Sequence, residues 1–322
     1  MKVMKKLQSF LVIMLCALFL SGCSEEHPKV ATTIYPLTYL VDRIAGNYVE
    51  VENISTDTLV QRAQLKEDYK KTLKNSDILF YIGGLEPYMD IYYDDIRSTK
   101  VNMVNLETKS AVYKFERYTT TTINGITTGV EAPYYDGDAF KMLDLYDSDP
   151  MLWMDPVAMT SMAHDICTSL SNQYPEYKKI FQSNYKKLEV DLARLDADYQ
   201  KIPEEHMQIS FVSMTPSFGI WQKSYGVNVY PVCLSKYGAL PTKDQLEAIK
   251  SRIRADKVRY MVLEQNLPED MAKLQQQLID ELGLTPINMS NLSSISESDQ
   301  KATKDYLTIM YENLKMLENM AS

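Results

Sequence analysis

The chain has 322 residues, more than one hydrophobic core usually organises, and this length favours two domains. Its composition is that of an ordinary globular protein, with 45% apolar and 24% charged residues. The formal net charge is -9 and the sequence contains no basic stripe, which excludes nucleic acid as an expected partner.

The N-terminus has the parts of a bacterial export signal in the expected order. A basic segment precedes an apolar run of 11 residues, too short to span a bilayer, and the run ends in Leu20-Ser21-Gly22-Cys23. Small residues before a cysteine resemble a lipobox, so we expect residues 1–22 to be removed, Cys23 to carry lipid and residues 23–28 to form a tether. A plain signal peptide with an incidental Cys23 is the alternative.

Strand and helix patterns alternate through the first third of the chain. The apolar patterns predict strands at residues 30–34, 49–54, 78–82 and 101–106, and helices at 37–44 and 65–73. Gly46 is expected to end the first helix. Such alternation is typical of a parallel sheet with helices on both faces.

Residues 107–148 break this alternation and are expected to form a loop with some extended structure. The segment contains four successive threonines and is rich in acidic residues, with Asp136, Asp138, Asp144 and Asp147 followed closely by Asp149. Carboxylates of this kind bind hard cations. A solvated acidic loop is the alternative, and we favour it.

A single long helix is predicted between Pro175 and Pro203. Apolar and aromatic residues follow one another there at intervals of three or four, which places them on one face of a helix about 39 Å long. The stripe consists of Tyr177, Phe181, Tyr185, Leu188, Leu192, Leu195, Tyr199 and Ile202. Either a coiled coil or a rigid helix between two domains accounts for it.

The strand and helix alternation then restarts. Strands are predicted at residues 209–214, 227–232 and 258–263, and helices at 218–225, 245–253, 271–282 and 303–320. The predicted fold class is α/β, with two parallel-sheet lobes joined by one long rigid helix and a ligand cleft between the lobes. The expected divisions are an N-terminal lobe over 29–173, a linking helix over 174–203 and a C-terminal lobe over 204–322.

The segment Asp149–Pro156 resembles a signature of the cluster A-I solute-binding lipoproteins of zinc and manganese ABC importers. That signature usually reads Asp-Pro-His-x-Trp-Leu-Asp-Pro, whereas this chain has Met151 in place of the histidine. Further likeness lies in residues 32–37, 77–81, 84–87, 217–219 and 240–242, in Glu264, and in Tyr306, Met310, Asn313 and Leu314. The resemblance implies a monomeric receptor at the extracytoplasmic face of a bacterial envelope, held to the membrane only by its lipid, with an ABC permease as partner.

The resemblance also implies four metal-ligand positions, usually three histidines and one acidic residue. The corresponding residues here are Gln61, Met151, Thr215 and Ser290, of which Met151 is fixed by its distance from Trp153. All four are neutral, weak donors for Zn²⁺ or Mn²⁺, the cargo ions that the family implies. A methionine thioether prefers Cu(I), which we consider a less favoured cargo. The chain's histidines, His27, His164 and His206, are not placed to substitute.

Two functions therefore stay open. One is the receptor of a metal-type importer with an altered metal site, and the other is a surface interaction or adhesin-like lipoprotein that keeps the fold without binding metal. An enzyme is not expected, because the sequence offers no catalytic triad, phosphate loop or recognisable carboxylate pair. The sequence does not decide whether Cys167 and Cys233 form a disulfide, and two buried unpaired cysteines are the favoured interpretation.

Overall fold

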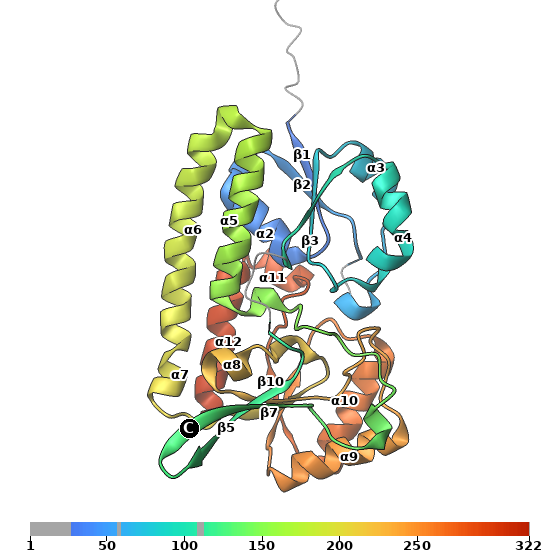
Figure 1. Cartoon of the computed structure of the whole chain (residues 1–322), viewed down its shortest axis with the longest axis vertical. Helices are drawn as coiled ribbons and strands as arrows, with labels where there is room; N and C mark the ends of the chain where they lie inside the picture. The colour runs from blue at the N-terminus through green and yellow to red at the C-terminus, as the bar shows by residue number, and fades with distance from the viewer. Residues whose placement is uncertain (1–26, 57–58, 108–112, 322) are drawn as a thin grey trace, which may run out of the picture.

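The computed structural model describes residues 27–56, 59–107 and 113–321, which form two lobes stacked along the longest axis of the molecule (Figure 1). The expected signal peptide and Cys23 lie outside these residues. Within the described part of the chain, no helix combines the length and the apolar character needed to cross a membrane.

The first lobe is built on a four-stranded parallel sheet with the order β2-β1-β3-β4. Its strands are β1 (Lys29–Thr32), β2 (Glu50–Asn53), β3 (Ile78–Tyr81) and β4 (Asn102–Asn105), and its helices are α2 (Tyr35–Ala45), α3 (Tyr69–Lys74) and α4 (Pro87–Ser98). Neighbouring residues of β1 and β3 belong to different core clusters, with Phe80 in one and Leu79 in the other. Both faces of this sheet are therefore buried, as expected for a parallel sheet.

The second lobe repeats this plan with the strand order β10-β9-β7-β8, again parallel. Its strands are β7 (Ser210–Ser213), β8 (Asn228–Pro231), β9 (Tyr260–Leu263) and β10 (Thr285–Asn288). Its helices are α8 (Trp221–Tyr225), α9 (Lys243–Ala255), α10 (Glu269–Leu282), α11 (Glu297–Lys301) and α12 (Tyr306–Ala321). Thr242 and Gln245 form a reciprocal capping box at the start of α9, which explains why this helix begins where it does.

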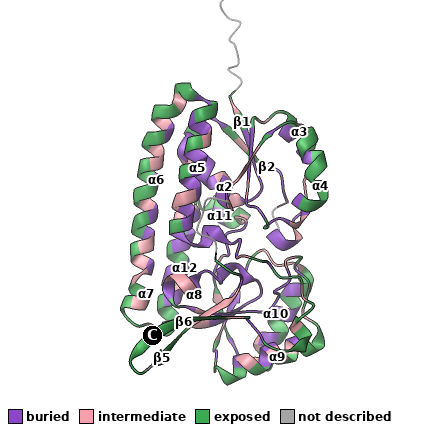
Figure 2. Ribbon diagram, in the orientation of Figure 1, coloured by how far each residue is buried: buried purple, intermediate pink, exposed green. Residues whose placement is uncertain are grey.

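Two long helices pack against each other on one side of the molecule, and the longer one extends along both lobes (Figure 1). They are α5 (Pro156–Gln173) and α6 (Lys178–Tyr199), and the short helix α7 (Lys201–Glu204) follows α6. Helix α6 packs against α5, α2 and α12, so it contacts elements of both lobes. Its seam of Phe181, Leu188, Leu192, Leu195 and Tyr199 is fully buried, whereas much of the rest of the helix is exposed (Figure 2). The seam therefore joins the two cores, as the interpretation as a rigid inter-domain helix requires.

The segment predicted as a loop contains the longest strands in the described part of the chain. Strands β5 (Arg117–Ile123) and β6 (Ile126–Ala132) form an antiparallel hairpin. The hairpin lies on the second lobe, where Arg117 pairs with Asp256 at 3.6 Å and Lys223 of α8 forms an ion pair with Glu131. The hairpin precedes the linking helix in sequence but covers the second lobe. The expected boundary of the N-terminal lobe at residue 173 stays a prediction.

Several helices differ from the sequence-based prediction. Helices α4, α5 and α11 are not among the predicted elements, and α3 begins at Tyr69 instead of near residue 65. The later start has a local cause, because Leu65 forms a β-bridge with Ser55 and the amide of Lys66 donates to the carbonyl of Ile54. Cys167 and Cys233 are both buried free thiols.

Candidate metal-binding cleft

Three hydrogen bonds that involve aromatic side chains hold the segment from Asp149 to Pro156 against the second lobe. The indole of Trp153 donates to the carbonyl of Asn291 at 2.8 Å, and that of Trp221 donates to the carbonyl of Met154 at 2.8 Å. The Tyr306 hydroxyl donates to the carbonyl of Trp153 at 2.6 Å. These aromatic side chains are fully buried, so each polar atom needs such a partner. The two tryptophans and Tyr306 therefore fix the position of Met151 relative to the second lobe.

Met151 is itself completely buried beside a carboxyl group. Its amide donates to Oδ1 of Asp149 at 3.0 Å. Burial raises the pKa of Asp149 to about 7, although this hydrogen bond and the charge of Lys223 oppose the shift. A side chain at Gly219 would lie 3.2 Å from Oδ2 of Asp149, so this carboxyl group packs directly against the second lobe.

Thr215 lies in a network around one buried carboxylate of the second lobe. Oε1 of Glu264 accepts the amides of Met214 and Thr215 at 2.9 and 3.0 Å, and Oε2 accepts the Thr215 hydroxyl at 2.6 Å. The same Oε2 accepts Nδ2 of Asn291 at 2.8 Å. Burial raises the pKa of Glu264, and the donated hydrogen bonds oppose this shift. Glu264 therefore joins the loop after β7 to the loop after β10.

Ser290, in the loop after β10, is held by the last helix. Its amide donates to Oδ1 of Asn313 at 3.0 Å, and its carbonyl accepts Nδ2 of Asn313 at 2.8 Å. The Ser290 hydroxyl accepts the amide of Leu292 at 3.1 Å, so it contributes to a local turn. This hydroxyl already has a partner within its own loop.

Gln61 lies where the first lobe meets the second. It belongs to a short 3-10 turn, Val60–Arg62, and its side chain is buried with no hydrogen-bond partner for either amide atom among the described residues. A side chain at Gly238 would lie 3.2 Å from Cβ of Gln61, which shows how closely the two loops approach. A buried amide without partners is costly, so this position is suited to a bound ion, water or ligand atom.

A cavity of about 330 Å³ opens between the lobes, at the carboxyl ends of β3 and β4. Its lining includes Gly83, Glu86, Glu107, Asp147 and Lys236. Glu86 accepts a hydrogen bond from Thr33, its other oxygen has no partner among the described residues, and burial raises its pKa to about 7. The described parts of the chain contain no group of three or more His, Cys, Asp or Glu side chains able to hold a metal ion.

The structure thus connects three of the four predicted loops directly, whereas the loop of Gln61 approaches a different loop, that of Gly238. Thr215 and the neighbour of Ser290 share Glu264, Asp149 beside Met151 contacts Gly219, and Gln61 contacts Gly238. The sequence-based reasoning missed the role of Glu264 and placed Asp149 in a solvated loop. The sequence did contain a sign that Asp149 is not a free loop residue. An aspartate two residues before Met151 can accept the Met151 amide in a local turn.

Comparison with known proteins gives a consistent picture. A family model described as "ZnuA: Zinc-uptake complex component A periplasmic" matches residues 30–320. The zinc-binding lipoprotein AdcA of Streptococcus pneumoniae serotype 4 is 26% identical over 98% of this chain, which spans 61% of that relative.

Solved structures share the fold. The Zn(II)-bound ZnuA-like domain of Streptococcus pneumoniae AdcA superposes with a TM-score of 0.67 at 22% identity, covering 92% of this chain and 99% of that domain. The periplasmic zinc-binding protein TroA of Treponema pallidum superposes with a TM-score of 0.72 at 16% identity, covering 92% of this chain and 99% of TroA. The α/β architecture with two parallel-sheet lobes is therefore confirmed.

Proposed function

The chain belongs to the ZnuA family of zinc-uptake components, and we propose that it is the solute receptor of a metal-type ABC importer. The two-lobe fold supports this role, since a ligand can be enclosed between lobes joined by a helix, α6, that contacts both. Relatives named as zinc-binding and metal-ABC-transporter lipoproteins support a divalent metal, zinc first, as the cargo. Family membership also supports a binding role in place of catalysis.

We further propose that the cargo site is the altered set Gln61, Met151, Thr215 and Ser290. Two observations support this proposal: the loops that contain Met151, Thr215 and Ser290 contact one another, and none of the four side chains is ionisable. Neutral amide, thioether and hydroxyl donors bind Zn²⁺ far more weakly than imidazole or carboxylate. The site would therefore release zinc readily or accept a softer ion.

The remaining expectations complete the proposal. A lipid on Cys23 would hold the chain at the extracytoplasmic face of the envelope, and a permease would receive the cargo. The relatives named lipoproteins support the anchor. The receptor would act as a monomer.

Restoring the family ligands gives the direct test. We would compare residues 24–322 with a variant carrying Gln61→His, Met151→His, Thr215→His and Ser290→Asp, and measure bound Zn²⁺, Mn²⁺, Fe²⁺ and Cu(I). The restored variant should bind zinc tightly, and an ion at 100 times its Kd should stabilise it by about 2.7 kcal/mol. A control with Gln208→His, Met142→His and Thr308→His, outside the cleft, should not gain a zinc site.

The outcomes separate the candidate functions. Metal bound by the unaltered chain, and lost in Met151→Leu, supports an active receptor. Zinc bound only by the restored variant supports the alternative of an interaction protein that has lost metal binding. No zinc bound by either chain shows that the four positions are placed wrongly.

A further inference from the structure

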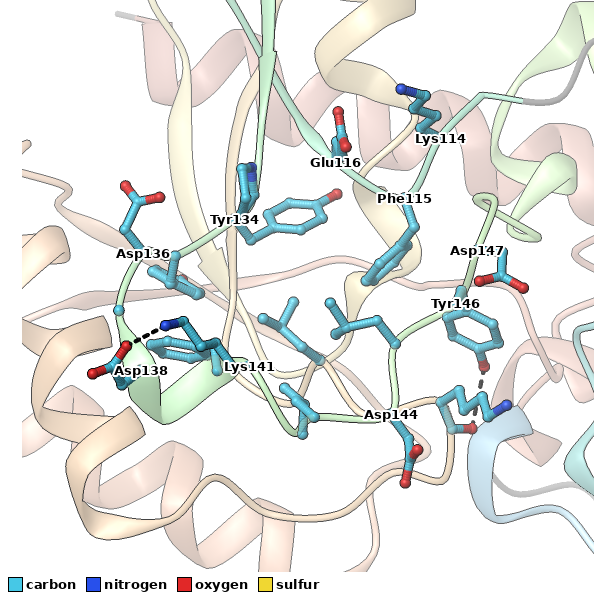
Figure 3. A pocket seen from close by; sticks show the side chains of 18 residues that line it. Lys114, Phe115, Glu116, Tyr134, Asp136, Asp138, Lys141, Asp144, Tyr146 and Asp147 are labelled. Atoms are coloured by element: carbon cyan, nitrogen blue, oxygen red, sulfur yellow. Dashed lines mark hydrogen bonds and ion pairs between the residues drawn. The ribbon is translucent and has the colours of Figure 1, made fainter.

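A second, larger cavity is lined by none of the four family positions. Its volume is about 790 Å³, within the range of small-molecule pockets. It is open to solvent on one side and is lined by residues 133–147, by the chain just before β5 and by the loop after β8 that contains Leu234 and Lys236 (Figure 3). This is the acidic segment that the metal-receptor function leaves unexplained.

The loop that covers the cavity is fastened to the second lobe at several points. Nε2 of Gln245 donates to the carbonyl of Ala139 at 2.8 Å, and the amide of Lys236 donates to the carbonyl of Asp144 at 2.9 Å. Nε2 of Gln222 donates to the Tyr134 hydroxyl at 3.2 Å. The second lobe therefore supports this loop directly and gives the cavity a defined shape.

Aromatic side chains form much of the wall. The ring of Phe115 lies 5.3 Å from that of Tyr134 and 5.4 Å from that of Tyr146, centroid to centroid. A second pair, Tyr135 and Phe140, is stacked at 5.5 Å. Tyr134 and Tyr135, which are adjacent in sequence, thus belong to different groups of rings. The Tyr135 side chain is 7% exposed, and its hydroxyl has no hydrogen-bond partner within the described residues.

Charged groups stand around the edge of the cavity, whereas the rings of Phe115 and Tyr134 turn toward its middle (Figure 3). The lining contains five acidic residues and three lysines: Glu116, Asp136, Asp138, Asp144, Asp147, Lys114, Lys141 and Lys236. Lys141 pairs with Asp138 at 2.6 Å, which leaves four carboxylates against two lysines. Among these lining residues negative charges therefore exceed positive charges by two, and Arg252, whose charge acts on Asp136, offsets part of this excess.

We propose that this cavity binds a small organic cation with an aromatic or apolar body. Aromatic faces attract cations and also bury apolar surface, so one wall serves both parts of such a ligand. The acidic rim favours a positive group over a neutral or negative one. A bare metal ion would instead need several carboxylates at one point, and no such group is found in the described residues. This second site adjoins the cleft, since Asp147 and Lys236 line both cavities, but none of the four family positions lines it.

The test uses three probes with one carbon skeleton: 4-phenylbutylamine, 4-phenylbutanol and 4-phenylbutanoate. Calorimetric titration into residues 24–322 should show that the amine binds about tenfold more tightly than the alcohol. The carboxylate should bind more weakly than the alcohol. Spermidine, which has charge without an aromatic body, should bind more weakly than 4-phenylbutylamine.

Two sets of variants connect the binding to this cavity. The rim pair Asp136→Asn and Asp144→Asn involves exposed residues and should weaken the amine about threefold to tenfold while leaving the alcohol unchanged. The same change at two distant exposed aspartates, Asp94 and Asp280, serves as the matched control and should alter neither. Phe115→Leu keeps apolar volume but removes a ring, and should weaken the amine more than the alcohol.

Three results would overturn the proposal. The first is that none of the skeleton-matched probes binds, and the second is equal affinity for the amine and the alcohol. The third is amine binding that the rim pair and the control pair weaken to the same extent. Because Asp136 and Asp144 are exposed, their substitution tests the site without depending on the stability of Phe115→Leu.

Discussion

Arg62 of the first lobe binds Asp270 of the second through two hydrogen bonds of 2.8 Å each. Its Nε donates a further hydrogen bond, also of 2.8 Å, to the carbonyl of Gly238. The neighbouring residue, Gln61, is one of the four family positions. The ion pair is partly exposed, with 28% of the Arg62 side chain and 46% of that of Asp270 accessible, so its direct effect on folding stability is small. Its geometry instead holds the two lobes together beside the cleft.

We predict that Arg62→Ala opens the cleft with little loss of stability. The free energy of unfolding should fall by no more than about 1 kcal/mol, because the pair is exposed. Distances between spin labels on Asp94 and Asp280, in helices of opposite lobes, should become longer and more broadly distributed. The control is Arg252→Ala, since Arg252 pairs with Asp256 inside the second lobe. An unchanged distance distribution in Arg62→Ala would contradict the prediction.

The pH dependence of stability should run opposite to ordinary acid denaturation between about pH 5 and 7. Burial raises the pKa of Glu86 from 4.5 to about 7 and that of Asp149 from 3.8 to about 7. The folded state therefore binds protons that the unfolded state has already released, and stability falls as pH rises through this window. For each group the full effect is on the order of 3–4 kcal/mol.

Denaturant unfolding at pH 5.0, 6.0, 7.0 and 8.0 measures this dependence. Glu86→Gln and Asp149→Asn should each flatten the profile, since an amide stays neutral throughout. If the free energy of unfolding of the unaltered chain instead increases from pH 5 to pH 7, neither Glu86 nor Asp149 determines its pH dependence.

The same substitution should have opposite effects at Glu86 and Glu264, two buried carboxyl groups of different lobes. Glu264 accepts four hydrogen bonds, so the amide nitrogen of Glu264→Gln would face a donor and leave it unpaired. We expect a loss of about 1–3 kcal/mol at pH 8. Glu86 accepts a side-chain hydrogen bond from Thr33 at one oxygen, and Glu86→Gln keeps an acceptor for it. Glu86→Gln should therefore be as stable as the parent, or more stable, at pH 8. Equal losses of unfolding free energy in Glu86→Gln and Glu264→Gln would contradict this prediction.

The sequence predicts most of the regular elements because their apolar residues repeat with the period of a buried strand or helix. The seam from Phe181 to Tyr199 is the clearest example, and its leucines are fully buried. Helix α4 was missed because its outer face carries Ile91, 75% exposed, and two exposed tyrosines, which blur the amphipathic pattern. The β5–β6 hairpin was missed because strand pairing depends on partners distant in sequence, and its threonines alone indicate only extended chain.

The candidate site was harder to predict than the fold. Positions such as Met151 follow from their distance to Trp153, but the network around Glu264 depends on which loops meet in space. Burial decides the behaviour of Asp149 in the same way: its sequence neighbours suggest a solvated acidic loop, whereas the structure encloses it and raises its pKa. The spacing of residues along the chain does not predict contacts between loops that are distant in sequence.

The buried seam of α6 should make the two lobes unfold together. Leu188 is fully buried in the helix that contacts both α2 of the first lobe and α12 of the second. Leu188→Ala leaves a cavity that the surrounding side chains cannot fully fill, so it should lower the free energy of unfolding by about 2–5 kcal/mol. Because α6 is shared, hydrogen exchange of amides in both β3 and β9 should accelerate to a similar extent. Val190→Ala on the same helix, where the side chain is 55% exposed, should change stability by less than about 0.5 kcal/mol. Acceleration confined to one sheet would show that α6 belongs to one lobe alone.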